Sequence, residues 1–175
     1  RRQRQMCIRD SYNGVKSFET VDNGIKITAR ENNHARIHLW ADEGDDSADK
    51  WEIMATTQGQ MRFYHGTSSE NTLVLNGDGA VELYHDNSKK LATNSDGIDL
   101  GDNVKLRIGD APDYKIYHNG SSTYHENYTG DLFIKSDQMY LTSWTGGETY
   151  LHAVLNGRVA LYYNNTLRLE TTDGA

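Results

Sequence analysis

Residues 79–97 read GAVELYHDNSKKLATNSDG, and residues 157–174 repeat the pattern as GRVALYYNNTLRLETTDG once one residue is deleted near the end. Gly, Val, Leu, Tyr, Asn, Leu, Thr and the final Asp-Gly pair coincide in the two stretches. In each stretch an alternating segment ends at Tyr, an Asn-rich turn follows, and a second segment ends at Thr. This pattern predicts a β-hairpin. Because one hairpin is marginally stable in water, we expect it to stack on neighbouring hairpins or on other chains.

A third copy of this unit lies near the start of the chain. Residues 12–24 align with residues 163–174 through the Asn turn, an apolar-Glu-Thr triplet and the closing Gly. A related stretch at 113–120, DYKIYHNG, shares the Tyr-His-Asn turn but continues differently. The chain is therefore expected to alternate two hairpin types.

The rest of the chain also alternates apolar and polar residues in short runs, which indicates half-buried strands. Clear runs lie at 25–29, 104–108, 132–134 and 159–163. Asn-Gly and Asp-Gly dipeptides separate the runs, and both supply the positive φ of tight hairpin turns. The predicted turn residues of the repeats are Asn13, Gly14, Asn23, Gly24, Asp96, Gly97, Asn119, Gly120, Asp173 and Gly174. The expected fold class is all-β, made of short antiparallel hairpins, with a long polar loop or one helical turn at 42–50.

Composition excludes several classes of protein. The chain has 175 residues, a formal net charge of −7 and a single Cys. One Cys rules out an internal disulfide framework, and no apolar run approaches the roughly 18 residues of a membrane span. The acidic balance disfavours non-specific nucleic-acid binding. Gly, Asp and Asn make up 46 residues, whereas only 36% of residues are hydrophobic. We therefore expect a thin core that repeats along an axis, or one that other chains complete.

Both ends of the chain look like artificial boundaries. Residues 1–11, RRQRQMCIRDS, resemble a translated sequencing adapter of the kind found in metagenomic assemblies, and we leave them out of the expected fold. The alternative is a basic arm for nucleic acid or membrane. Without them, 14 basic and 24 acidic residues leave a charge of −10. At the other end, no strand follows residues 173–174, so we expect a fragment of a longer protein. The remainder divides into a β-rich region at 12–60, with the acidic loop at 42–50, and a hairpin-repeat region at 61–175.

Three stretches carry a resemblance to a known family. They are VELYHDNSKKLATNSDGI at 81–98, LRIGDAPDYKIYHNGSSTYHENYTGDLFIKS at 106–136 and VALYYNNTLRLETTDGA at 159–175. These stretches resemble the repeats of tail-fibre proteins from marine bacteriophages, including cyanophages. The resemblance covers about residues 12–30 and 61–175, and is less distinct over 34–55. It implies a structural segment of a virion tail fibre, elongated and homotrimeric, with other tail proteins as partners and a host-surface glycan or protein as the receptor.

Histidines and carboxylates are the candidate metal ligands. Tyr-His pairs occur at 64–65, 84–85, 117–118 and 124–125. His34 and His38 would lie about 13 Å apart on a strand, too far to hold one ion within a chain. We expect each Tyr to pack inward and each His to lie at a strand end beside a turn; His residues around a symmetry axis are the alternative. The acidic loop could bind Ca²⁺, but its spacing does not match an EF-hand, and a solvated loop is favoured. No cofactor is expected.

Catalytic motifs are lacking. The sequence contains no Gly-x-Ser-x-Gly, no Gly-rich phosphate loop and no His-Glu-x-x-His. Carboxylate pairs suited to glycoside hydrolysis could arise anywhere in so acidic a chain, but none lies in a setting that suggests a raised pKa. We therefore expect no enzyme activity and keep a tailspike-like glycosidase as the second alternative.

Exposed aromatic residues give the first alternative, a glycan-binding adhesin module. Trp144 stands in a predicted turn and, with Tyr150, is the candidate glycan or receptor contact. The competing interpretation is that Trp144 packs against a neighbouring chain. Trp40 and Trp51 flank the acidic loop and are expected to pack together under it.

Overall fold

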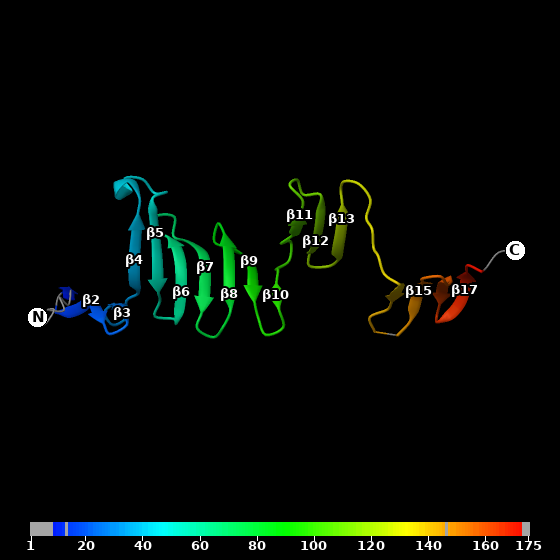
Figure 1. Ribbon diagram of the computed structural model, residues 1–175, viewed down its shortest axis with the longest axis horizontal. Helices are drawn as coiled ribbons and strands as arrows, with labels where there is room; N and C mark the ends of the chain where they lie inside the picture. Colours follow the sequence, from blue (N-terminus) through cyan, green and yellow to red (C-terminus); the bar gives the residue numbers. More distant parts are fainter. Residues whose placement is uncertain (1–8, 13, 146, 173–175) are drawn as a thin grey trace, which may run out of the picture. The chain divides into compact units, whose positions relative to one another are not determined.

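The computed structural model describes residues 9–12, 14–145 and 147–172, and it is built almost entirely of antiparallel strands (Figure 1). The chain divides into two compact units, Arg1–Glu126 and Asn127–Ala175. The first unit holds three sheets and the second holds one. The predicted all-β class with short antiparallel strands is confirmed. Among the described residues, no helix has the length and apolar character that crossing a membrane requires.

The first sheet contains β1 (Arg9–Tyr12), β2 (Val15–Val21) and β3 (Gly24–Ile27). The Cα partners of the β1–β2 ladder occupy positions equivalent to those of the last hairpin of the chain, β16–β17. Both ladders have a register shift at the same point, as the predicted third copy requires. Residues 9–11 belong to β1, although the sequence had suggested leaving residues 1–11 out of the fold. Their backbone pairs with β2 and so forms part of the sheet.

The second sheet has seven strands that follow one another in chain order, β4 to β10. Their bounds are β4 Ala35–Trp40, β5 Lys50–Ala55, β6 Gln60–His65, β7 Glu70–Asn76, β8 Val81–His85, β9 Ser88–Thr93 and β10 Ile98–Asp99. A 3₁₀ turn, η1 (Asp42–Gly44), interrupts the β4–β5 connection, as the expected helical turn allowed. The boundary expected between residues 60 and 61 falls inside β6. It is wrong as a structural division, because each strand pairs with its neighbours on both sides of this point.

A third sheet closes the first unit, and a fourth makes up the second unit. The third contains β11 (Leu106–Ile108), β12 (Tyr114–His118) and β13 (Thr123–Asn127). The fourth contains β14 (Gln138–Thr142), β15 (Thr149–Val154), β16 (Val159–Tyr163) and β17 (Thr166–Glu170). The strand expected at 132–134 is wrong, because this segment has no partner strand and takes no regular structure.

The strands β6–β9 recur as β14–β17, and Gln60 and Gln138, which begin the two sets, lie 138 − 60 = 78 positions apart. Every pair of Cα partners in the β7–β8 and β8–β9 ladders has a counterpart at that offset in β15–β16 and β16–β17. The register shifts that follow Phe63 and Leu83 recur after Leu141 and Leu161. The structural repeat therefore spans four strands, two more than the similarity in sequence had indicated.

The predicted turns at Gly14, at Asp96 and Gly97, and at Asn119 and Gly120 are confirmed. Gly14 has φ 78° in a two-residue turn that joins Tyr12 to Val15, and Asn13 lies outside the described residues, as do Asp173 and Gly174. At 94–97 the Asn94 side chain accepts hydrogen bonds from the N–H groups of Asp96 and Gly97. In the same way, Asn119 accepts from residues 121 and 122 beside Gly120, whose φ is 95°.

The prediction for Asn23 and Gly24 is wrong in detail. Val21 and Gly24 are partners, so the turn residues are Asp22 and Asn23, and Gly24 already belongs to β3. Neither Asn23 nor Gly24 has a positive φ. This turn therefore does not depend on the conformational freedom for which Asn-Gly was singled out.

Candidate functional site

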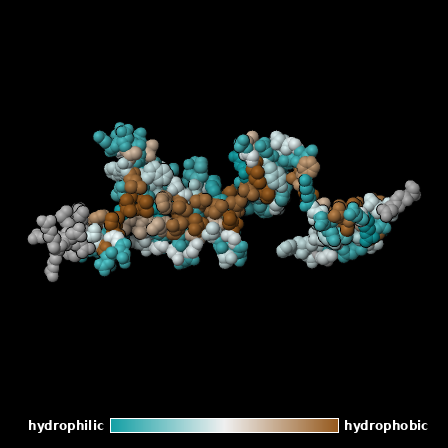
Figure 2. Space-filling view, in the orientation of Figure 1, coloured by the Kyte–Doolittle hydropathy of each residue, from teal (hydrophilic) through white to brown (hydrophobic). Residues whose placement is uncertain are grey.

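The apolar face of the seven-stranded sheet is the most extensive candidate site. One row of directly opposed residues crosses six strands: Ile37, Ile53, Phe63, Leu73, Leu83 and Leu91. We call the side that bears this row the apolar face, and Figure 2 shows brown apolar side chains gathered over these strands. Every pair of elements in extensive contact is a pair of neighbours within one sheet, so no second layer covers this face within the described residues.

The second unit carries the same feature in shorter form. Leu141, Leu151, Leu161 and Leu169 oppose one another across all four strands, and we call them the leucine row. Leu141 and Leu169 remain 54% and 64% exposed. Contiguous apolar surface of this kind is typical of interaction sites, because monomeric proteins rarely leave it in water.

The opposite face of the seven-stranded sheet is mainly polar, and several of its charged side chains are paired within the chain. Glu52 is buried and lies 3.2 Å from Arg36 Nη1 and 3.4 Å from His38 Nδ1. Met54 and Val74 occupy the row between Arg36, Arg62 and Glu82 and are the most buried apolar side chains of the sheet. Long polar side chains thus cover the apolar ones on this face.

An ion pair with a tyrosine completes the polar face at β8. The Tyr84 hydroxyl donates a hydrogen bond to Glu82 Oε2 at 2.7 Å, and Lys89 Nζ lies 3.1 Å from Oε1. The bond from Tyr84, and then Lys89, hold the pKa of the Glu82 carboxyl below its ordinary value. The same bond to Glu82 raises the pKa of Tyr84 to about 12. In the second copy Ala160 replaces Glu82, and the charge moves to Glu170 on the opposing strand, 2.7 Å from Arg158 Nη1.

Trp144 lies fully in solvent, as the glycan hypothesis requires. It follows Ser143 in the β14–β15 turn, where Ser143 N–H donates to Glu148 O at 2.8 Å and Glu148 N–H donates to Ser143 Oγ at 3.0 Å. The Trp144 side chain is 98% exposed, and Tyr150, in β15, is 50% exposed. No ring contact joins the two aromatics within the described part of the second unit, so the structure does not bring them together as one platform.

The expectation that Trp40 and Trp51 pack together is wrong. Trp51 lies opposite Leu39, one position before Trp40, so the two indoles lie on opposite faces of the sheet. Only Trp40 lies under the acidic loop: a Cβ placed on Gly44 would come within 3.0 Å of its ring. Trp51 instead meets the ring of His65 edge-on.

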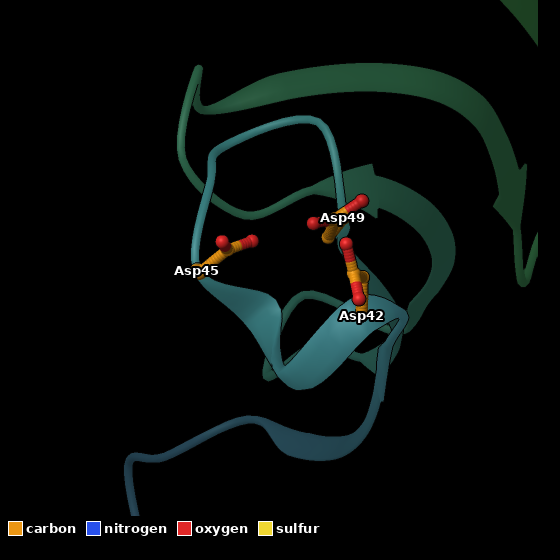
Figure 3. A group of neighbouring side chains, drawn as sticks. All are labelled: Asp42, Asp45 and Asp49. Carbon is orange, nitrogen blue, oxygen red and sulfur yellow. The ribbon is translucent and has the colours of Figure 1, made fainter.

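The acidic loop brings three carboxylates together (Figure 3). One oxygen each from Asp42, Asp45 and Asp49 lies within 4.8 Å of the others. The η1 turn brings Asp45 back toward Asp42, and Asp49 lies immediately before β5 on the other side of the loop. Carboxylate oxygens are the ligands that Ca²⁺ prefers, so these three residues could hold such an ion. The sequence identified the loop but not which of its carboxylates converge.

Most histidines of the Tyr-His pairs lie at strand ends beside turns, as the structural interpretation predicted. His65, His85 and His118 end β6, β8 and β12 beside turns, as predicted. His125 lies inside β13, so the prediction fails there, and its Nδ1 is 2.8 Å from the Tyr114 hydroxyl. His34 precedes β4 and accepts a hydrogen bond from Thr57 N–H at 3.2 Å.

The chain matches no model of a known protein family, and it shows no significant match to a curated protein or to a solved structure.

Proposed function

We propose that this chain is a structural segment of a bacteriophage tail fibre, which assembles as a homotrimer and extends the receptor-binding part of the appendage from the virion. The observation that carries the proposal is the uncovered apolar face, repeated in the second unit as the leucine row. A fibre segment needs such a surface, because its core is supplied in part by the other copies of the chain. The tail-fibre-like repeats support the assignment to a virion.

The chemistry of the two faces favours identical copies as the occupants of the apolar face. The polar face carries ion pairs and hydrogen bonds within the chain, whereas the apolar face offers Ile, Leu and Phe side chains without charges in its row. Burial of such side chains contributes about 25 cal/mol per Å² of apolar surface, which favours an extensive dry interface over a small polar contact.

Sedimentation velocity tests this proposal on the full chain. We expect wild type to sediment as a trimer, and Leu83→Glu and Leu161→Glu to sediment as smaller species, because each variant places a charge within an apolar row. Ser95→Glu adds the same charge in an exposed turn and serves as the matched control. If the wild-type chain is a compact monomer in dilute buffer, the proposal fails. Immunogold labelling of virions that carry this chain tests the assignment to a tail fibre.

A second candidate function is a glycan-binding adhesin module, favoured by the complete exposure of Trp144. An indole so placed can stack on the apolar face of a sugar ring. Titration with purified bacterial surface polysaccharides should then change Trp144 fluorescence, and Trp144→Ala should lose both the change and the binding without loss of fold. Tyr163→Ala, another exposed aromatic in the same unit, is the control. Release of reducing sugar during the titration would favour the glycosidase instead.

A further inference from the structure

The outer edge of β14 differs from the equivalent edge in the first copy of the repeat. In the first copy, β5 pairs antiparallel with β6, and Ile53 opposes Phe63 in the apolar row. In the second copy, β14 is the terminal strand of its sheet, and no strand of the described chain pairs with this edge. The internal repeat thus shows what occupies such an edge: an antiparallel strand that adds apolar side chains to the row.

The segment at 131–135, DLFIK, has the composition of that missing strand. It alternates Leu132 and Ile134 with Phe133, yet it forms no regular structure. These three side chains are 51%, 70% and 74% exposed, in the order Leu132, Ile134 and Phe133. A β-forming segment with its apolar side chains in water is a candidate for pairing with an open strand edge.

One register joins the segment to the leucine row. Tyr64 and Phe63 oppose Glu52 and Ile53, and their counterparts in β14 are Thr142 and Leu141. An antiparallel strand from another copy that sets Leu132 opposite Leu141 extends the leucine row by one position, since Leu132 then takes the place that Ile53 has opposite Phe63. A five-residue strand ends opposite Thr142, before the turn that carries Trp144.

The first copy of the repeat has a glycine where the second copy has Trp144. Gly66, the counterpart of Trp144, donates its N–H to Lys50 O at 2.9 Å. A Cβ on Gly66 would lie 3.1 Å from Glu52 Oε1. A side chain at this position lies close to the neighbouring strand, and residues 131–135 end opposite Thr142, two residues before Trp144.

The chain's own connection does not turn the segment back onto β14. Between β5 and β6 the chain reverses through residues 56–59, where Gly59 has φ 76° and donates to Thr56 O at 3.2 Å. Only Ser136 and Asp137 separate residue 135 from β14, and neither has the positive φ that a two-residue hairpin turn uses. Asp137 O instead accepts the Leu155 N–H at 2.7 Å, which continues the β14–β15 ladder.

We propose that residues 131–135 of one copy add as an antiparallel strand to the β14 edge of another copy, so that the chains exchange strands as they assemble. The inference rests on the self-association in the proposed function and names one of its contacts. Exchange satisfies the edge and buries the segment without the tight turn that a single chain lacks. Each copy both gives and receives one strand, and in the proposed homotrimer three such contacts close a ring.

Cysteine cross-linking tests the exchange directly. In a Cys7→Ser background, full chains with Leu132→Cys and Leu141→Cys carry different tags and are refolded together under mild oxidation. We expect a disulfide between the two different chains, and a much lower yield for the control pair Leu132→Cys with Ser95→Cys. If instead one chain bearing both Leu132→Cys and Leu141→Cys closes an internal disulfide as a dilute monomer, the exchange is overturned.

A backbone variant separates this inference from the wider proposal. Phe133→Pro removes a backbone N–H donor from the segment. We expect the dissociation constant of the trimer to rise at least tenfold, with an unchanged circular dichroism spectrum. Phe133→Val should behave as wild type. A wild-type trimer that shows no cross-link and no effect of Phe133→Pro overturns strand exchange alone. A wild-type monomer overturns both proposals.

Discussion

The hydroxyl of Thr93 accepts a hydrogen bond from the backbone N–H of Val81 at 2.9 Å. The second copy of the repeat makes the same bond at the same length, from Val159 N–H to Thr171 Oγ1. The bond joins the start of one strand to the end of its partner, where the regular ladder stops. Threonine at this position therefore closes the hairpin, which explains why Thr survives in both copies while the residue before it changes from Ala to Glu.

Removal of this hydroxyl should weaken the first copy more than the second. Thr93→Val leaves a partly buried N–H without its acceptor, and we expect a loss of about 1–2 kcal/mol in the free energy of unfolding. Thr171 is exposed, so water can replace the acceptor and Thr171→Val should cost less. Urea denaturation followed by circular dichroism measures both, and Thr93→Ser should retain most of the stability. Equal losses for the two valine variants would contradict this account.

Asn87 combines a backbone and a side-chain role. Its φ is 56°, its Oδ1 accepts the Asn71 N–H at 3.0 Å, and Asn165 has the same role toward Thr149. Asn87→Ala loses the hydrogen bond and puts Ala in the left-handed region, so we expect a loss of about 2–3 kcal/mol on unfolding.

The comparison with Asn87→Gly separates the two contributions. Glycine accepts the positive φ and loses only the side-chain bonds, so its cost should be about 1 kcal/mol. Thermal unfolding of both variants gives the difference. If Gly is as damaging as Ala, the turn conformation is not what Asn87 supplies.

The Tyr84–Glu82 bond predicts a dependence of stability on pH. The pKa of Glu82 is lowered in the folded state, so its contribution is fully present above the ordinary value of 4.5 and is lost as the pH falls through the folded pKa. The pKa of Tyr84 is raised from 10.0 to about 12, so its contribution is present below pH 10.0 and is lost as the pH rises toward 12.

Tyr84→Phe should raise the pKa of Glu82. It should also weaken the dependence of the free energy of unfolding on pH in both the acidic and the alkaline range. The pKa can be followed by NMR titration of the Glu82 carboxyl carbon, and the stability by denaturation at stepped pH. Tyr162→Phe is the matched control, because Ala160 stands in the second copy where Glu82 stands in the first. An unchanged Glu82 titration in Tyr84→Phe would show that the bond from Tyr84 does not lower this pKa.

The Trp144 side chain should contribute little to the free energy of unfolding. Its side chain is 98% exposed, so Trp144→Ala should change the free energy of unfolding by less than about 0.5 kcal/mol. Acrylamide should quench its fluorescence efficiently in the unassembled chain. Protection of Trp144 from acrylamide on trimer formation would show that it contacts a neighbouring chain and would count against the glycan hypothesis.

The sequence predicted the local features correctly where the signal itself was local. Alternation with a period of two set the strands, and Asn-rich turns set the hairpins at Asp86-Asn87 and Asn164-Asn165, whose φ values are all positive. The extension of the repeat to β6 and β7 was missed because its side chains differ between the copies. The shared Gln-Met at 60–61 and 138–139 was the signal that could have revealed it.

The sequence failed where a contact depended on residues far apart. Trp40 and Trp51 seemed close because they flank one loop, but the β4–β5 register puts them on opposite faces. The convergence of Asp42, Asp45 and Asp49 depends on the path of the loop and could not be read from spacing alone.

By itself, then, the sequence determined the all-β class, the hairpin unit and most of its turns, since hydrophobic period and turn chemistry act between residues close along the chain. Only the tertiary structure decided that one face carries ion pairs within the chain while the other presents an uncovered apolar row. It also decided that β14 lacks the neighbour that β6 has, although Leu132 and Ile134 carry the pattern of a strand. A strand forms only where a second backbone accepts its hydrogen bonds, and the availability of that partner is a property of the assembled chain.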